Sequence, residues 1–135
     1  MSIRILIVDD HDVVREGVRA ILKKRSDWEI CGEAANGQEA MTQTENLRPD
    51  VVILDITMPN MSGLDVARRI VHNAPRSRIL MFTMHDSETV EQAVRGSGAH
   101  GLVLKLHAAR DLVKAVDTVI EGGTFFGAET TVKHV

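Results

Sequence analysis

The sequence has little cysteine, no long apolar run and no cluster of basic residues. Cys31 is the single cysteine among 135 residues, so no disulfide can form within the chain, and we expect a reducing, cytoplasmic setting. The apolar run from Ile5 to Val8 is too short for the core of a signal peptide. The sequence also has no apolar window of about 18 residues, the length that a membrane helix needs. These absences argue against a secreted disulfide scaffold and a membrane-spanning protein.

The charge balance is close to neutral. Lys and Arg together number 16 and Asp and Glu 19, which gives a formal net charge of -3. Without a basic patch, direct binding of nucleic acid by this chain is not expected. The hydrophobic fraction of 44% is ordinary for a globular protein and sufficient for the core of one domain.

Short apolar runs alternate with longer helical patterns along the chain. We expect strands at residues 3–8, 29–34, 51–54, 78–83 and 101–104. A first helical stripe follows the first strand, and capping signatures at Asn36 and Ser62 open the second and third helices. A fourth helix is expected near residues 87–95, and a fifth ends at Gly122. Five strand-then-helix units in series predict an α/β fold, with a parallel sheet and helices on both faces.

Polar residues stand where four of these strands end. Asp9 and Asp10 follow the first strand, Asp55 the third and Lys105 the fifth, while Thr83 closes the fourth. Any one of them alone would be an ordinary turn, cap or solvated residue. In a parallel sheet, however, the carboxyl ends of the strands share one edge, where ligands bind. The five residues together therefore predict a functional site.

Three converging carboxylates require a counter-charge. Two of them a few ångströms apart repel by about 4 kcal/mol at an effective dielectric constant near 20, and Lys105 supplies only one positive charge. Mg²⁺ suits such a site because it binds carboxylate oxygens and keeps positions for phosphate. Asp55 is then the best candidate for a nucleophile that attacks a phosphoryl group, with Asp9 and Asp10 as the pair that holds the metal.

Four blocks of the sequence resemble the receiver domains of two-component response regulators. They are "VDDHDVVREGV", "VVILDITMPNMSGLD", "ILMFTMHD" and "GAHGLVLK", and their order and spacing also agree over about residues 3–121. Within that family the blocks look most like the NarL/FixJ group, whose members carry a LuxR-type helix-turn-helix domain. The resemblance implies a single flavodoxin-like, doubly wound domain with a five-stranded sheet of order 2-1-3-4-5.

The resemblance also implies roles for the residues at the strand ends. Asp55 corresponds to the phosphoacceptor, and the direct Mg²⁺ ligands would be Asp10, Asp55 and the backbone carbonyl of Thr57. Asp9 would act on the ion through water. Mg²⁺ is accordingly the expected cofactor.

Two further residues would sense the phosphoryl group, and one position departs from the family pattern. Thr83 and Lys105 correspond to the phosphate-sensing pair. The family commonly has Tyr or Phe three residues before the lysine, whereas this chain has Leu102. An inward-swinging aromatic gate is therefore not expected at this position.

By resemblance, the chain is a phosphorylation-dependent switch and not a multiple-turnover enzyme. It would take a phosphoryl group from a sensor histidine kinase, catalyse that transfer itself and lose the group slowly. Residues 1–121 would form the receiver, and residues 122–135 a tail leading to a DNA-binding domain that this chain does not have room for. A homodimer could form through the fourth helix, fifth strand and fifth helix, or through the first and fifth helices.

Three alternatives remain open at this point. A phosphohydrolase that turns over an aspartyl phosphate is one, although such enzymes place an Asp-x-Asp after the first strand, and Thr57 stands two residues after Asp55. A flavodoxin-like cofactor binder is another, but "DDHD" would repel phosphate in the absence of a metal. A degenerate receiver that only binds proteins is the third, and Leu102 keeps it open.

Overall fold

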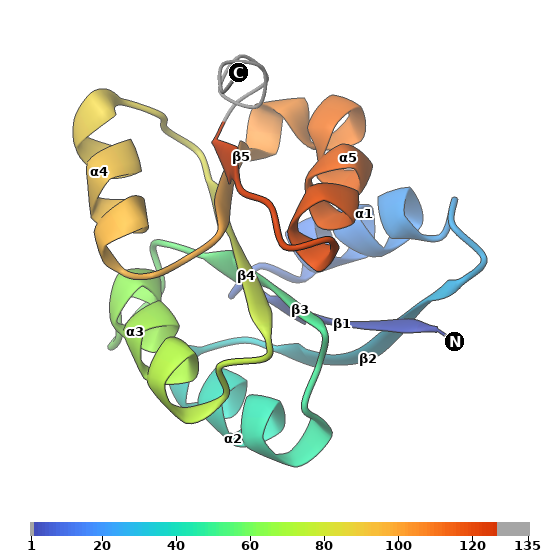
Figure 1. Cartoon of the computed structure of the whole chain (residues 1–135), viewed down its shortest axis with the longest axis horizontal. Coiled ribbons are helices and arrows are strands. Elements are labelled where there is room, and N and C mark those ends of the chain that lie inside the picture. Colours follow the sequence, from blue (N-terminus) through green and yellow to red (C-terminus); the bar gives the residue numbers. More distant parts are fainter. Residues whose placement is uncertain (1, 127–135) are drawn as a thin grey trace.

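Six parallel strands among the described residues form one sheet through the middle of the molecule (Figure 1). The computed structural model describes residues 2–126. The strands lie in the order β2-β1-β3-β4-β5-β6, and every neighbouring pair is parallel. Their bounds are β1 Ile3–Val8, β2 Trp28–Ala34, β3 Val51–Asp55, β4 Arg78–Thr83, β5 Gly101–Leu104 and β6 Phe125–Phe126. The predicted order of the first five strands is confirmed.

The prediction of a five-stranded sheet is wrong, because β6 adds a sixth strand beside β5. Phe125 pairs with Gly101, and its backbone N–H donates to the carbonyl of His100 at 3.0 Å. A Cβ at Gly101 would lie 2.7 Å from the Phe125 carbonyl oxygen, so the glycine permits this close approach. Both Phe side chains are buried. The rest of the predicted tail, residues 127–135, lies outside the described residues.

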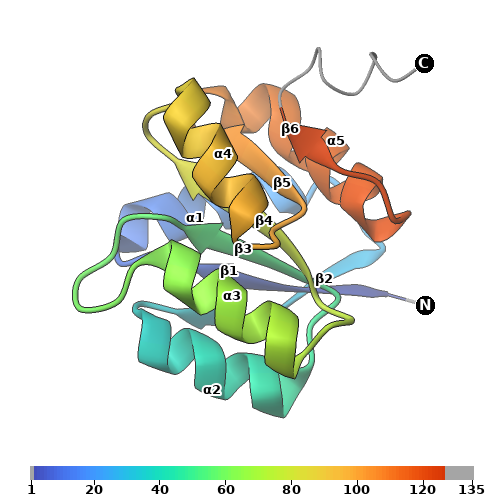
Figure 2. The ribbon, with the colours of Figure 1, turned by 60° about the vertical axis from the view of Figure 1, so that its left-hand side comes forward.

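The part of the chain that the structure describes has five α-helices, which cover the two faces of the sheet (Figures 1 and 2). Helices α1 and α5 pack on one face, and α2, α3 and α4 pack on the other. The bounds are α1 Asp12–Leu22, α2 Gly37–Leu47, α3 Gly63–Asn73, α4 Glu88–Gly96 and α5 Ala108–Ile120, with a short 3-10 turn, η1, over Lys105–His107. The predicted alternation of strands and helices on both faces of the sheet is confirmed.

The alternation of side chains along β1 shows how the sequence builds both layers. Ile5 and Ile7 point into the core under α1 and α5, whereas Leu6 and Val8 belong to the core under α2, α3 and α4. This is the two-residue period of a strand that is buried on both faces. The strand is thereby held in register up to its last apolar residue, and the acidic residues that follow must emerge at the edge of the sheet.

The predicted helix starts are confirmed where side chains cap them. Asn36 accepts the backbone N–H of Glu39 at 2.9 Å and opens α2. Ser62 accepts the N–H of Leu64 at 3.1 Å and opens α3. Such caps satisfy amide groups that have no partner within the helix. They fix where the chain turns from the carboxyl end of each strand into its helix.

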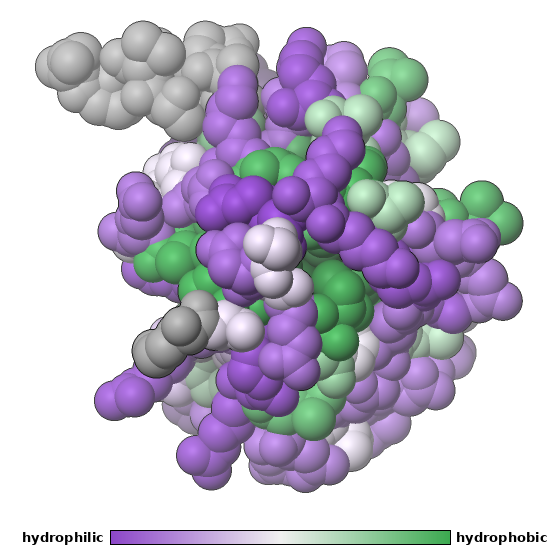
Figure 3. Space-filling model, turned by 90° about the vertical axis from the view of Figure 1, so that its right-hand side faces the viewer, coloured by the Kyte–Doolittle hydropathy of each residue, from purple (hydrophilic) through white to green (hydrophobic). Residues whose placement is uncertain are grey.

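One side of the surface around this buried core is largely polar. Seen from the side that is on the right in Figure 1, hydrophilic side chains dominate, with hydrophobic ones visible between them (Figure 3). None of the helices within residues 2–126 has the length and apolar character needed to cross a membrane.

Candidate functional site

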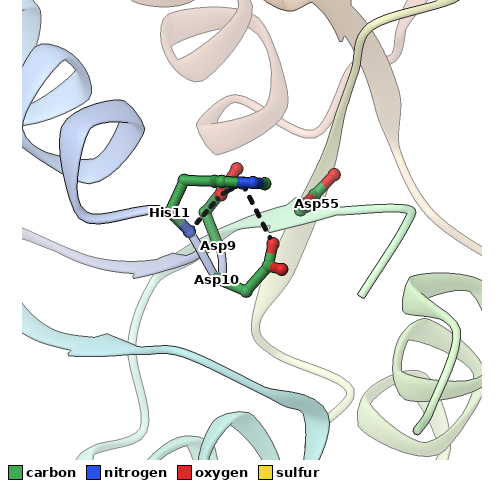
Figure 4. Close-up of side chains that lie close together, drawn as sticks. All are labelled: Asp9, Asp10, His11 and Asp55. Carbon is green, nitrogen blue, oxygen red and sulfur yellow. Dashed lines mark hydrogen bonds and ion pairs between the residues drawn. The ribbon is translucent and has the colours of Figure 1, made fainter. Parts of the chain in front are cut away.

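Three acidic residues and a histidine meet at the carboxyl edge of the sheet (Figure 4). Asp9, Asp10 and His11 form the turn after β1, and Asp55 is the last residue of the neighbouring strand β3. One ligand atom from each of the four residues lies within 4.8 Å of the others. The structure therefore brings together the three carboxylates that the sequence placed at one edge, and it adds an imidazole that the sequence analysis had not assigned to the site.

Lys105 lies between two of these carboxylates. Its Nζ is 2.8 Å from Asp9 Oδ2 and 3.3 Å from Asp55 Oδ1. It is the first residue of η1, directly after β5, and its side chain is only 12% exposed. The expected convergence of Lys105 with the acidic residues is thus present in the fold.

Burial and charge together shift the titration of this pair. The pKa of Asp55 is raised by its burial and by the charge of Asp9, which outweigh the opposing effect of Lys105. Burial acts to lower the pKa of Lys105, but its bonds and charge interactions with Asp9 and Asp55 outweigh burial and raise it. The ammonium therefore stays charged, and it balances only part of the negative charge in the site.

The two adjacent aspartates are in different environments. Asp9 is 1% exposed, and its Oδ1 accepts the backbone N–H of His11 at 2.9 Å. The Asp10 side chain is 25% exposed, yet its Oδ1 is buried and accepts no hydrogen bond from any described residue. His11 Nδ1 lies 3.2 Å from an oxygen of each aspartate. Asp9 is therefore paired with the Lys105 ammonium, while the nearest cationic group to Asp10 Oδ1 is the His11 imidazole, which is charged only when protonated.

The loop after β3 fixes the backbone around Asp55. The Thr57 amide donates to Asp55 Oδ1 at 3.3 Å, and the Gly63 amide donates to the Ile56 carbonyl at 2.7 Å. A Cβ on Gly63 would lie only 2.1 Å from the Asp55 carbonyl oxygen. Only glycine permits α3 to begin this close to the strand end.

Thr83 reaches the same edge, but its hydroxyl forms no hydrogen bond with the carboxylates of the described residues. It is buried, and its hydroxyl donates to the His85 carbonyl and accepts the His85 amide, both at 3.3 Å. Within residues 2–126 no hydrogen bond joins this hydroxyl to Asp55. Its position at the strand end was predictable, whereas the direction of its hydroxyl depends on the loop that follows.

Arg15 is a second residue at the site that the sequence analysis did not identify. Its guanidinium donates to the backbone carbonyl of Asp9 at 2.5 Å. An arginine within the first turns of a helix ordinarily reads as a solvated side chain. The sign in the sequence was its position in the first turn of the helix that follows the strand. Side chains of a helix point toward the N-terminus of that helix, so this one points toward the end of the preceding strand.

The donor set fits a hard divalent cation. Carboxylate oxygens from three aspartates converge, and two of them, Asp9 Oδ2 and Asp10 Oδ1, are buried and accept no hydrogen bond from the described residues. With Lys105 as the one ammonium that the described residues place among them, this arrangement is costly unless a cation completes it. Oxygen donors of this kind are those that Mg²⁺ prefers.

Comparison with known proteins decides the family. Residues 5–117 match the response regulator receiver domain family. This chain belongs to that family. A receiver is a phosphoryl-accepting signalling switch and not a typical multiple-turnover enzyme, and receivers generally bind Mg²⁺ at an acidic pocket. The acidic cluster after β1 and β3 has the character of that pocket.

Relatives of this receiver are transcription regulators. The chain is 34% identical over 130 residues to the transcriptional regulatory protein DegU of Brevibacillus brevis, covering 96% of this chain and 55% of that protein. The chain thus spans about half the length of this relative.

Solved structures place the receiver in the predicted group. A LuxR-family response regulator from Aurantimonas sp. SI85-9A1 superimposes with a TM-score of 0.91 at 32% identity, covering 97% of this chain and 94% of that one. The receiver domain of NarL from Mycobacterium tuberculosis gives 0.85 at 32% identity, covering 90% and 98%. Membership of the NarL/FixJ group is confirmed.

The position of the usual aromatic switch is filled differently in this receiver. Leu102 is buried and pairs with Met81 on one side and Phe126 on the other. The Arg95 guanidinium of α4 lies 3.9 Å from the centre of the Phe126 ring. An aromatic side chain is therefore present near this position, but it comes from β6.

Proposed function

We propose that Asp55 is the phosphoacceptor of this receiver, and that Asp10, Asp55 and the backbone carbonyl of Thr57 are direct ligands of Mg²⁺. Asp9 acts on the ion through a water molecule. The observation that carries the proposal is the convergence of Asp9, Asp10 and Asp55 around the single ammonium of Lys105. One positive charge leaves this cluster short of neutrality, and a divalent cation corrects the balance.

Asp55 is better suited to the nucleophilic role than its two partners. Its backbone is fixed by pairing with Phe82 on β4, and burial raises its pKa, which makes the carboxylate a stronger nucleophile than a solvated one. Asp9 is held by shorter contacts than Asp55. It accepts the His11 amide at 2.9 Å and lies 2.8 Å from Lys105 Nζ, whereas the corresponding contacts of Asp55 are both 3.3 Å. Asp10 suits metal coordination because its side chain is 25% exposed and has no ammonium or guanidinium partner among the described residues, only the His11 imidazole at 3.2 Å.

The reaction is a phosphoryl transfer to a carboxylate. A carboxylate oxygen of Asp55 forms a bond to phosphorus while the bond from phosphorus to the donor breaks, and the leaving group departs with that electron pair. The product is an acyl phosphate on Asp55. Lys105, already 3.3 Å from Asp55 Oδ1, neutralises charge on the transferring group. When bound, Mg²⁺ supplies the remaining positive charge.

Thr83 and Lys105 respond to the new phosphoryl group. Phosphorylation adds negative charge and acceptor oxygens at the end of β3. The Thr83 hydroxyl exchanges its 3.3 Å bonds with His85 for a bond to the phosphoryl group, so the loop between β4 and α4 shifts. The surface formed by α4, β5 and α5 changes with it, as in a two-state switch.

The partners follow from the family and its relatives. We propose a sensor histidine kinase as the donor and a LuxR-type DNA-binding domain as the output in the full-length regulator, in a cytoplasmic setting. Residues 1–121 act as the receiver and residues 122–135 as the connection to the output, a connection whose first part adds β6 to the receiver's sheet. Phosphorylation promotes a homodimer through α4, β5 and α5 or through α1 and α5, and slow self-dephosphorylation resets the switch.

The test is phosphorylation with a small acyl phosphate donor and Mg²⁺. Wild type should gain the mass of one phosphoryl group, and treatment with hydroxylamine should remove it. Asp55→Asn should gain none, whereas the control Asp65→Asn, at an exposed carboxylate of α3, should behave as wild type. Equal labelling of Asp55→Asn would refute the assignment. Asp10→Asn should sharply weaken Mg²⁺ binding, and unchanged affinity would refute its role as a ligand.

A further inference from the structure

Arg15 uses all three nitrogens of its guanidinium to hold the turn between β1 and α1. Nε donates to Glu33 Oε1 at 3.0 Å, one terminal nitrogen donates to the Asp9 carbonyl at 2.5 Å, and the other donates to the Asp12 carboxylate. The side chain is only 15% exposed. A nearly buried guanidinium with three separate partners is far more constrained than a surface arginine.

The glutamate that anchors this arginine is itself fixed. Glu33 lies on β2 and pairs with Ile7 of β1. Its second carboxylate oxygen accepts Arg19 at 2.5 Å, and its backbone carbonyl accepts the Gln43 side chain at 2.6 Å. Arg15 therefore connects the acidic turn to a rigid point in the sheet.

The contact with the Asp9 carbonyl bears directly on the acidic pair. That carbonyl belongs to the planar peptide group joining Asp9 to Asp10, so holding its oxygen fixes the orientation of the backbone from which both carboxylates project. Mutual repulsion of Asp9, Asp10 and Asp55 in the absence of a cation favours opening of this turn. Arg15 opposes that opening without lying among the ligand atoms.

We propose that Arg15 is a positioning residue that preorganises Asp9 and Asp10 for divalent cation binding. This inference rests on the proposed metal site and adds a residue that acts through the backbone of the turn. The charge of Arg15 alone would repel a cation, so a purely electrostatic role makes the opposite prediction. If Arg15 acted only through its charge, removing it would tighten metal binding. If Arg15 positions the turn, removing it weakens metal binding.

The experiment is Mg²⁺ titration of the whole chain by calorimetry, with backbone amide NMR shifts of Asp10 and His11 as a second readout. Arg15→Lys keeps the charge and loses the three-nitrogen fork, and Arg15→Gln loses both. Both should weaken Mg²⁺ binding about tenfold, the lower range for residues that orient metal ligands. In both variants the metal-free amide signals of Asp10 and His11 should shift or broaden.

Arg19→Gln is the matched control. The substitution removes one positive charge and the ion pair between Arg19 and Glu33. The Arg19 side chain makes no hydrogen bond to the Asp9 carbonyl in the wild-type protein, so the Mg²⁺ affinity of the variant should stay within about twofold of wild type. Glu33→Gln, which keeps both arginines, should give an intermediate loss and serves if an Arg15 variant folds poorly. Thermal unfolding of each variant establishes that titrations are made on folded protein.

The outcomes separate this inference from the function on which it rests. If wild type binds Mg²⁺ and Arg15→Gln binds it equally or more tightly, Arg15 is not a positioning residue, and the metal site stands. If wild type binds no Mg²⁺, the proposed function fails and the inference falls with it.

Discussion

The ammonium of Lys105 lies 2.8 Å from Asp9 Oδ2, and the two side chains are 12% and 1% exposed. Removing one member of a buried ion pair leaves the other charge without compensation. Here the remaining charge would be Asp9, close to Asp10 and Asp55. The pair therefore links the stability of the fold to the cation that the site binds.

Lys105→Met should destabilise the metal-free protein by about 3 kcal/mol, because Asp9 then stays buried without a counter-charge. Mg²⁺ should bind this variant more tightly than wild type, since the ammonium no longer competes for the carboxylates. Urea unfolding with and without Mg²⁺ measures both effects.

Lys24→Met is the control for that experiment, because it removes the same charge from an exposed position. Its stability should stay within about 0.5 kcal/mol of wild type, with or without Mg²⁺. A Lys105→Met protein as stable as wild type in the absence of metal would contradict the ion-pair account.

Gly63→Ala should lower both stability and phosphorylation. Its Cβ would meet the Asp55 carbonyl oxygen at 2.1 Å, so α3 must move away from the loop that holds the phosphoacceptor. Gly17→Ala is a matched control inside α1, where a Cβ meets nothing within 4 Å, and it should stabilise by about 0.5–1 kcal/mol. Urea unfolding and phosphoryl labelling of the two variants should diverge; equal behaviour would contradict the close-approach argument.

Much of the site could be predicted from the sequence because apolar runs fix its residues. The buried apolar runs that end at Val8 and Leu54 deliver Asp9, Asp10 and Asp55 to one edge of the sheet, independently of the side-chain contacts formed there. The contacts of Arg15 could not be predicted, because they depend on how α1 lies over β2. The hydroxyl direction of Thr83 depends likewise on the conformation of the next loop.

Strand β6 escaped prediction because two phenylalanines carry no periodicity. Its place depends on a long-range contact in which Gly101 leaves room for the backbone of Phe125. Short edge strands are specified by their packing partners more than by local propensity. The sixth strand is therefore a property of the folded sheet and not of its local sequence.

Phe125→Ala tests whether β6 contributes to the fold. The side chain is 1% exposed and packs in the core beneath α5, so the loss should be about 3 kcal/mol or more. Leu106→Ala, at a side chain that is 83% exposed, should change the free energy of unfolding by less than about 0.5 kcal/mol. Urea unfolding that cannot distinguish Phe125→Ala from wild type would argue against the strand.

His100 should make stability depend on pH. Its Nδ1 accepts the Ile79 amide at 3.0 Å, and burial, aided by the charge of Arg78, lowers its pKa below 6.5. The unfolded chain therefore binds a proton that the folded chain resists. This contribution to stability is complete above the unfolded pKa of 6.5 and is lost as pH falls through the folded pKa.

Urea unfolding at about pH 7.5 and about pH 5.5 measures this effect. His100→Asn keeps an acceptor for the Ile79 amide but cannot titrate, so the loss of stability between the two pH values should be smaller than in wild type. An identical pH dependence in the two proteins would show that His100 titrates normally in the folded state.

The most direct test of the central claim is to locate the phosphoryl group. The chain is phosphorylated with a small acyl phosphate donor in the presence of Mg²⁺, reduced with borohydride, which converts an aspartyl phosphate to homoserine, and sequenced as peptides by mass spectrometry. Homoserine should appear at position 55 and disappear when Mg²⁺ is chelated. Homoserine at Asp9 or Asp10 in place of Asp55, or none at any position after treatment with donor and Mg²⁺, would contradict the account.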